Sequence, residues 1–234
     1  MQMNSLSKKS PLSLWRVLLL LVHYFIGYLF LYPMILTKIT LYLDPNALAI
    51  PDSFLFMTYV FMVISTIWII LPVWKESHQL YLEKRPNLIW SNIKLLGMLL
   101  FVSIVLGMLV SVFSGETNSV NEQVVLYELK RSPLISLFSI LIYSPIVEEC
   151  VFRGGIYRTL RSKCNVLVSM LITGIVFGGI HVLDSLLIGN WNDVWFLFVY
   201  GGVSTLLCYS YEKNETLYSS VLLHFMNNLL AIFL

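Results

Sequence analysis

Seven long apolar runs, separated by short polar segments, constrain the fold of this 234-residue sequence more than any other feature. Each run approaches the about 20 apolar residues that a helix needs to cross the hydrocarbon core of a membrane. The composition agrees, because 58% of the residues are hydrophobic and only 12% are charged, too few to cover a soluble domain of this size. The alternation typical of barrel strands is absent. We therefore predict an all-α, polytopic integral membrane protein with about seven transmembrane helices. The runs are 12–36, 53–74, 93–113, 133–157, 166–183, 194–211 and 217–234.

The charge balance and the cysteines exclude several other classes of protein. A net charge of only +2 gives no reason to expect a nucleic-acid partner, so the expected surroundings are the lipid bilayer. Cys150, Cys164 and Cys208 are odd in number, and their spacing fits neither a zinc cluster nor a disulfide framework. We interpret them as small core residues.

The distribution of Lys and Arg predicts the orientation in the membrane. With the N-terminus inside, the inner segments carry most of the basic residues, as the positive-inside rule requires. The first run is too long for a signal-peptide core and is expected to remain as an anchor. We therefore predict a multi-pass protein of the cell membrane with a cytoplasmic N-terminus. The inner residues are Lys8, Lys9, Arg16, Lys75, Lys84, Arg85, Lys94, Arg158, Arg161, Lys163 and Lys213, and the outer ones are Lys38, Lys130 and Arg131.

The outer segment 114–132 divides the chain. It mixes Glu116, Glu122 and Glu128 with apolar residues, a composition suited to a short interfacial helix. The three spans before it hold few interior charges, whereas the four spans after it hold nearly all the buried polar residues. We predict an N-terminal three-helix membrane region at 1–131 and a catalytic core in the last four spans at 132–234.

Ionisable side chains within a span are costly, by about 2.5 kcal/mol or more at its centre, so each needs a reason. Glu149 and Arg153 lie four residues apart and share a helix face, where they can neutralise each other. Glu148 points about 100° away from Glu149 and is expected to have no partner on its own helix. Two further pairs have the same four-residue spacing: Phe177 with His181, and His224 with Asn228.

The depth of these residues follows from their distance to the nearest inner turn. Glu148 and His181 lie at similar distances from a turn near Lys163, so they should be level. His224 follows the next inner turn, near Asn214, by ten residues, or about 15 Å, which makes it shallower unless the helices start at different heights. The fifth predicted span, which carries His181, also contains Gly174 and Gly178. These two form a small-xxx-small pair that lets helices approach closely.

Structural interpretations compete with functional ones at several positions. The Glu149–Arg153 pair is more typical of a structural ion pair than of a catalytic one. His23 is best explained as an interhelical hydrogen-bonding residue, and His78 as a loop residue without a role. For His181 with Glu148, and for His224 with Asn228, a functional role is favoured.

A Glu, two His and an Asn in one buried pocket suit the activation of a water molecule. Glu148 would be the general base, with His181 holding the water or sharing its proton, while His224 and Asn228 donate to a developing oxyanion. The alternative is a divalent metal such as zinc, held by Glu148, His181 and His224. The His-Glu-x-x-His signature of zinc proteases does not occur.

Three motifs together resemble those of the CAAX protease and bacteriocin-processing (CPBP, or Abi) family, which includes the type II CAAX prenyl endopeptidases. They are Glu148-Glu149-x-x-x-Arg153, Phe177-x-x-x-His181 and His224-x-x-x-Asn228, in this order on successive late spans. The resemblance covers about 132–234. It implies an intramembrane endopeptidase, glutamate-dependent or metal-dependent, in which Glu148 and His181 activate water, His224 and Asn228 stabilise the oxyanion, and Glu149 and Arg153 shape the site.

The resemblance also implies a peptide or membrane-protein substrate, and a role in peptide maturation or bacteriocin self-immunity. Two alternatives remain. Buried Glu and His residues also mark proton relays, so the chain could be a proton-coupled transporter, although no inverted repeat of broken helices is visible. It could also be a non-catalytic immunity protein that binds a bacteriocin.

Overall fold

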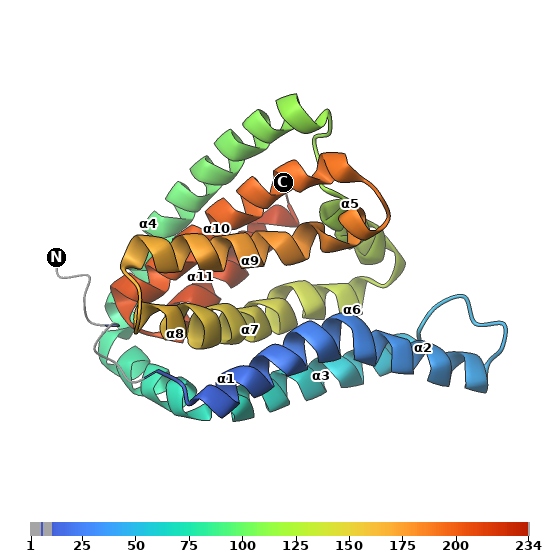
Figure 1. The fold of residues 1–234 in the computed structure, drawn as a ribbon, viewed down its shortest axis with the longest axis horizontal. Helices are drawn as coiled ribbons and strands as arrows, with labels where there is room; N and C mark the ends of the chain where they lie inside the picture. The colour runs from blue at the N-terminus through green and yellow to red at the C-terminus, as the bar shows by residue number, and fades with distance from the viewer. Residues whose placement is uncertain (1–5, 7–10, 234) are drawn as a thin grey trace.

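The computed structural model describes Leu6 and residues 11–233, and of residues 84–86 only the helical backbone. Every regular element in this part of the chain is helical, so the predicted all-α fold is confirmed. Figure 1 shows long helices lying roughly side by side, with the helices of residues 14–69 along one edge, most of the helix of residues 71–114 along the opposite edge, and the C-terminal helices between them.

The N-terminal region forms a long helical hairpin and a third, longer helix. The first arm is continuous but changes its winding, and its central part is π-helical. A loop leads to the second arm, which packs beside the first (Figure 1). The elements are α1 (Leu14–Leu21), the π-helix η2 (Val22–Leu31), α2 (Tyr32–Leu43), α3 (Asp52–Ile69) and α4 (Leu71–Ser114).

The C-terminal part begins with a short helix outside the apolar spans and continues with four antiparallel helical rods. The first rod is again interrupted by π-helical turns. The elements are α5 (Val120–Arg131), α6 (Pro133–Phe138), η3 (Ser139–Tyr143), α7 (Ser144–Glu149), η4 (Cys150–Tyr157), α8 (Arg158–Arg161), α9 (Val166–Leu187), the 3₁₀ turn η5 (Trp191–Trp195), α10 (Phe196–Asn214) and α11 (Leu217–Ala231).

Local sequence signals set the ends of these helices. Asn165 caps α9, its side chain accepting a hydrogen bond from the backbone N–H of Val168 at 2.9 Å. Ser119 caps α5 in the same way, accepting from Glu122 N–H at 3.1 Å. At its C-terminal end α4 stops at Gly115, whose φ of 76° is readily adopted only by glycine. A short helix, α5, thus forms in segment 114–132 as expected, and its position at the membrane interface stays a prediction.

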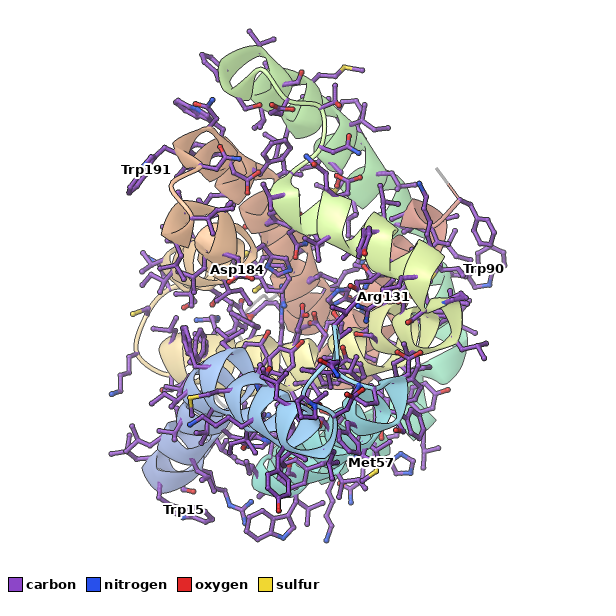
Figure 2. All side chains as sticks on the ribbon, turned by 90° about the vertical axis from the view of Figure 1, so that its right-hand side faces the viewer. Trp15, Met57, Trp90, Arg131, Asp184 and Trp191 are labelled. Atoms are coloured by element: carbon purple, nitrogen blue, oxygen red, sulfur yellow. The ribbon has the colours of Figure 1, made fainter. Side chains whose placement is uncertain are left out.

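Six helices in the described chain are long and apolar enough to cross a membrane, by length and composition: Leu14–Leu43, Asp52–Ile69, Asn87–Ser114, Pro133–Arg161, Val166–Leu187 and Trp191–Asn214. The seventh apolar run forms α11, which has 15 residues, fewer than the about 20 of a straight crossing. Many large apolar side chains face outward, as lipid-facing residues do; Trp15, Trp90 and Trp191, on the rim of Figure 2, are between 53% and 69% exposed. The chain is therefore a multi-pass membrane protein.

The expected inner connection between the second and third spans is not a loop. The residues that connect the two spans belong to α4, which is one continuous helix of 44 residues. Figure 1 places the start of α1, the turn after α8 and the end of α10 at one end of the molecule, and the α2–α3 loop and α5 at the other. This alternation agrees with the predicted topology, and the orientation itself stays a prediction. Lys8 and Lys9 lie outside the described residues, as do the side chains of Lys84 and Arg85.

Ion pairs of two buried arginines join helices at the end of the molecule where α8 turns into α9. Arg158 donates to Glu76 of α4 at 2.7 Å, and Arg161 pairs with Glu212 of α10 at 3.0 Å. Tyr157 also donates to Glu212, at 2.8 Å. Several of the predicted inner basic residues therefore join helices as well as orienting the chain.

His23 is satisfied by neighbouring polar groups, which agrees with its structural interpretation. Its two ring nitrogens lie 2.8 Å from Tyr32 Oη and 2.8 Å from Ser65 Oγ on α3. The N-terminal region also shares its packing with the C-terminal part, because the ring of Tyr24 lies 5.9 Å from that of Phe152 within one hydrophobic cluster. The division of the chain at 131/132 stays a prediction.

Helices α9 and α10 meet backbone to backbone. A Cβ added at Gly178 would lie 2.6 Å from the carbonyl oxygen of Leu197, and one at Gly174 would lie 3.0 Å from that of Gly201. The close approach expected from this glycine pair is therefore confirmed. It brings His181, one turn after Phe177 on α9, close to α10.

Candidate functional site

The predicted ion pair lies at the centre of a buried polar network. Arg153 Nη1 donates to Glu149 Oε1 at 3.0 Å, and both side chains have no exposed surface. The guanidinium is held further by Ser204 of α10, since Nη2 lies 2.9 Å from its carbonyl oxygen and 2.9 Å from its hydroxyl. It also lies 5.0 Å from the centre of the Phe177 ring, within cation–π range. The pair thus fixes the helix of the two carboxylates against α10.

His224 joins this network from α11. Its Nδ1 lies 2.9 Å from Glu149 Oε1, the same oxygen that accepts from Arg153. A carboxylate oxygen can only accept, so Nδ1 carries the proton in this bond. The other ring nitrogen, Nε2, is left to face a reacting group. The estimate that His224 is shallower than the other site residues is wrong, because the ring is in direct contact with Glu149.

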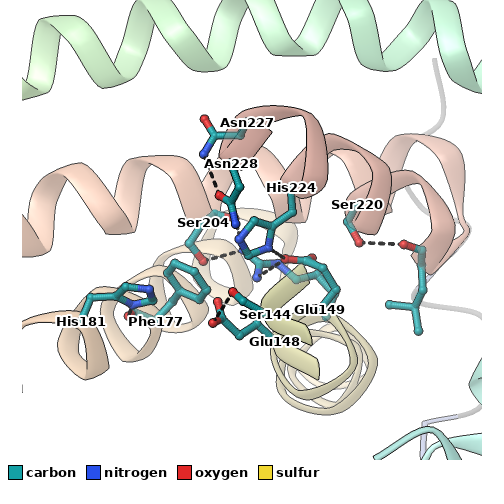
Figure 3. A network of polar contacts seen from close by, with 12 residues as sticks. Ser144, Glu148, Glu149, Phe177, His181, Ser204, Ser220, His224, Asn227 and Asn228 are labelled. Atoms are coloured by element: carbon teal, nitrogen blue, oxygen red, sulfur yellow. Dashed lines mark hydrogen bonds and ion pairs between the residues drawn. The ribbon is translucent and has the colours of Figure 1, made fainter. Parts of the chain in front are cut away.

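Glu148 points away from its neighbour, as the helix geometry predicts. In Figure 3 its carboxylate lies on the side of Phe177 and His181, whereas Glu149 turns toward His224. Ser144 Oγ donates to Glu148 Oε1 at 2.7 Å. The other oxygen, Oε2, is buried and has no hydrogen-bond partner within the described chain. The expectation that Glu148 has no partner on its own helix is therefore wrong, because a serine one turn earlier donates to it.

His181 lies close to Glu148 and presents one free nitrogen. Its Nδ1 lies 2.8 Å from the carbonyl oxygen of Phe177 on the preceding turn of α9. Because a carbonyl only accepts, Nδ1 carries the proton, and Nε2 keeps a lone pair. In Figure 3 the Glu148 carboxylate lies on the same side of the network as the Phe177 and His181 rings. The structure thus brings Glu148 and His181 into one neighbourhood.

Asn228 faces the same region from the next turn of α11 (Figure 3). Its side-chain amide donates to the carbonyl oxygen of Ile140 at 2.9 Å, and its oxygen accepts from Asn227 at 3.3 Å. One amide hydrogen remains for another acceptor. Ile140 belongs to the π-helical η3, so this bond ties α11 to the interrupted rod that carries Glu148 and Glu149.

The interruptions of this rod follow from its sequence. Pro145 has no backbone N–H to donate, and it lies in the first turn of α7, directly after the π-helical η3. Gly154 and Gly155 let other helices approach η4, since a Cβ at Gly155 would lie 2.6 Å from the Leu20 side chain. Such π-turns are frequent at functional sites. They set the rotation of the two carboxylates relative to α9 and α11.

Several neighbours of the site were missed in the sequence. Ser144 was readable, because it lies four residues before Glu148 and so shares its helix face. Ser204 and Tyr200 were not, since both lie on α10, which carries no recognisable motif. The ring of Tyr200 lies 4.4 Å from that of His181.

The three side chains proposed as zinc ligands do not form a metal-binding cluster in the described structure. Among the described residues, no three His, Cys, Asp or Glu side chains are arranged to hold one metal ion. In the set of Glu148, His181 and His224, each side chain already uses one polar atom in a bond to the protein. Such bonds are also usual for histidines that bind a metal, so it is the arrangement of the three side chains, and not their bonds, that does not fit a three-ligand site in the described structure.

Comparison with known proteins agrees with the three motifs. Residues 130–230 match the family model described as type II CAAX prenyl endopeptidase Rce1-like, and all six candidate site residues lie in this stretch. The chain is similar to the membrane-embedded CAAX protease MroQ of Staphylococcus aureus, with 23% identity over 92% of this chain and 87% of that protein.

A second relative is YdiL of Bacillus subtilis, which carries the provisional name of membrane peptidase. It is 26% identical over 121 residues, which cover 52% of this chain and 45% of YdiL. The match therefore spans less than half the length of that relative. No solved structure matches the chain with statistical significance.

Proposed function

Because residues 130–230 match the family model described as type II CAAX prenyl endopeptidase Rce1-like, we propose that this chain is an intramembrane endopeptidase of the cell membrane. Glu148 is the general base that activates water in this proposal. The bond that Ser144 donates holds one oxygen of Glu148, and the other oxygen has no partner among the described residues. Glu149 Oε2 also lacks a partner there, but Glu149 is paired with Arg153 and His224. The half-satisfied Glu148 carboxylate beside His181, with no cation paired to it in the described chain, is the observation that carries the proposal, because a base needs a free oxygen at a fixed position.

The reaction follows from the free atoms of the site. A water molecule between Glu148 and His181 gives a proton to the Glu148 carboxylate as its oxygen attacks the carbonyl carbon of the scissile peptide bond. The carbon–nitrogen bond of the resulting tetrahedral intermediate then breaks. Glu148 returns the proton to the leaving amine, and the carboxylic acid product departs. His181 orients the water by accepting its second hydrogen at Nε2.

His224 and Asn228 stabilise the oxyanion in this scheme. Since His224 already donates from Nδ1 to Glu149, it can donate to the oxyanion only as an imidazolium, with a second proton on Nε2. Asn228 contributes its remaining amide hydrogen. Removing one such donor commonly lowers kcat by about 10²–10³-fold.

The relatives suggest where to look for a substrate. The family model is described as that of a prenyl endopeptidase, and MroQ is named a CAAX protease. We propose a peptide or membrane-protein substrate that reaches the site from within the bilayer, and we place the N-terminus in the cytoplasm.

The test is cleavage by the purified chain in liposomes. The probes are quenched fluorescent peptides ending in Cys-aliphatic-aliphatic-X, with and without a farnesyl group, and apolar peptides without that ending. Glu148→Gln should lower kcat by about 10²–10⁴-fold at an unchanged melting temperature, the usual contribution of a general base. Glu116→Gln, which removes an exposed carboxylate outside the spans, is the matched control and should change neither. Wild-type rates in Glu148→Gln would remove the base from this mechanism.

A further inference from the structure

Tyr200 on α10 lies next to His181 and belongs to none of the three sequence motifs. The two rings are stacked, with their centroids 4.4 Å apart and their planes inclined by 26°. The Phe177 ring lies 4.5 Å from the same imidazole. The imidazole of His181 is thus flanked by one aromatic ring from its own helix and one from α10.

The hydroxyl of Tyr200 is fixed from outside the spans. It lies 2.6 Å from Ser119 Oγ, and the side-chain amide of Asn121 donates to it at 3.2 Å. Ser119 is fully buried and is also the residue that caps α5. The first turn of α5 therefore holds the far end of the Tyr200 ring.

This first turn of α5 is itself anchored. The backbone N–H of Val120 donates to Asp193 Oδ1 at 3.0 Å, and Ser185 of α9 donates to Asp193 Oδ2 at 2.5 Å. Asp193 is buried, in the short turn between α9 and α10. A chain of contacts thus runs from the end of α9, through α5, to Tyr200 and His181.

We infer that Tyr200 is a positioning residue, which holds the His181 imidazole so that its Nε2 faces the water activated by Glu148. The inference rests on the proposed function for its catalytic consequence, but the orientation of the ring is a property of the fold. The bond from Nδ1 to Phe177 fixes the ring only from its own helix. The stacked ring of Tyr200 restricts rotation of the imidazole, and so preserves that bond and its tautomer.

The first experiment measures the ring and needs no substrate. In protein labelled with ¹⁵N-histidine and reconstituted in liposomes, His181 is identified among the four histidines by its loss in His181→Gln. The wild type should show one tautomer, with the proton on Nδ1. Tyr200→Phe, which keeps the ring, should retain it, whereas Tyr200→Leu should show a mixture of both tautomers. Tyr209→Leu, the same change on the same helix, should leave the His181 signals unaltered. Unaltered His181 signals in Tyr200→Leu would overturn the inference.

The second experiment asks whether Tyr200 acts through His181. Tyr200→Leu should lower kcat by about 10²-fold with little change in KM, as expected when a catalytic group is misplaced by about 1 Å. In a His181→Gln background the same change should cause no further loss, because the group that it positions is gone. An equal loss in both backgrounds would contradict the inference. A chain that cleaves no probe, yet shows the tautomer change, would count against the proposed function alone.

Discussion

His224 on α11 donates a hydrogen bond from Nδ1 to Oε1 of Glu149 over 2.9 Å, and this contact joins the last helix to the rod of the two carboxylates. Glu149 is fully buried and Arg153 donates to the same oxygen. One oxygen of Glu149 therefore orients an ion pair and a histidine at once. Each of the two glutamates keeps a second oxygen, Oε2, without a hydrogen-bond partner among the described residues.

Glu149→Gln should lower both stability and activity. The change leaves Arg153 buried without its counter-charge, at a cost of about 3–5 kcal/mol, and weakens the contact that orients His224. Glu149→Gln combined with Arg153→Met should recover part of the stability but not the activity. Thermal melting and peptide cleavage on the same samples check this prediction. Equal melting temperatures for the single variant and the wild type would show that the pair does not support the fold.

Gly178→Ala should disturb the site through the packing of α9 on α10. The added methyl group would lie 2.6 Å from the backbone oxygen of Leu197, so the helices must move apart, at about 1–3 kcal/mol. His181, three residues later, would move with α9, and cleavage should fall. Gly179→Ala is the matched control, because a Cβ there has no neighbour within 4 Å and should be tolerated. Similar melting curves and rates for the two variants would contradict the observed close approach.

The predicted orientation can be tested by cysteine labelling in intact cells. Cys164→Ser removes the partly exposed native thiol, and Cys150 and Cys208 are buried. In that background, Glu116→Cys should react with an impermeant maleimide from outside, whereas Ser162→Cys should react only after the membrane is opened. Both replaced side chains are exposed. The reverse pattern would show that the N-terminus lies outside.

Chelation separates the two versions of the chemistry. With Glu148 as base and no three-ligand cluster among the described side chains, a strong chelator should leave the cleavage rate unchanged. A loss of activity that only zinc restores would make Glu148 a ligand and Glu149 the more suitable base. Glu148→Gln serves as the inactive reference.

The sequence predicts the parts of this structure that depend on one helix at a time. Apolar length located the spans, and the four-residue spacing placed Glu149 beside Arg153 and turned Glu148 away from it. Contacts between helices could not be predicted from the sequence, because they depend on where each helix starts and how it is wound. The depth estimate failed for His224 on this account. Tyr200 and Ser204 escaped notice because ordinary residue types acquire a role only through the close packing of α9 on α10.

Arg153 pairs with only one of the two adjacent carboxylates, and this pairing affects how many protons the ionisable groups of the site must carry. When both glutamates are ionised, His181 is neutral and His224 carries the second proton that its proposed role requires, the two carboxylates are balanced by the guanidinium and the imidazolium. An uncompensated charge is costly inside a membrane, so this balance matters. The water that attacks a peptide bond gives a proton to Glu148 while the negative charge passes to the oxyanion, so the net charge of the site and substrate together does not change. On the proposed mechanism, the hydrolytic cycle therefore moves a proton between groups within the site, and the surrounding bilayer never has to deliver or remove one.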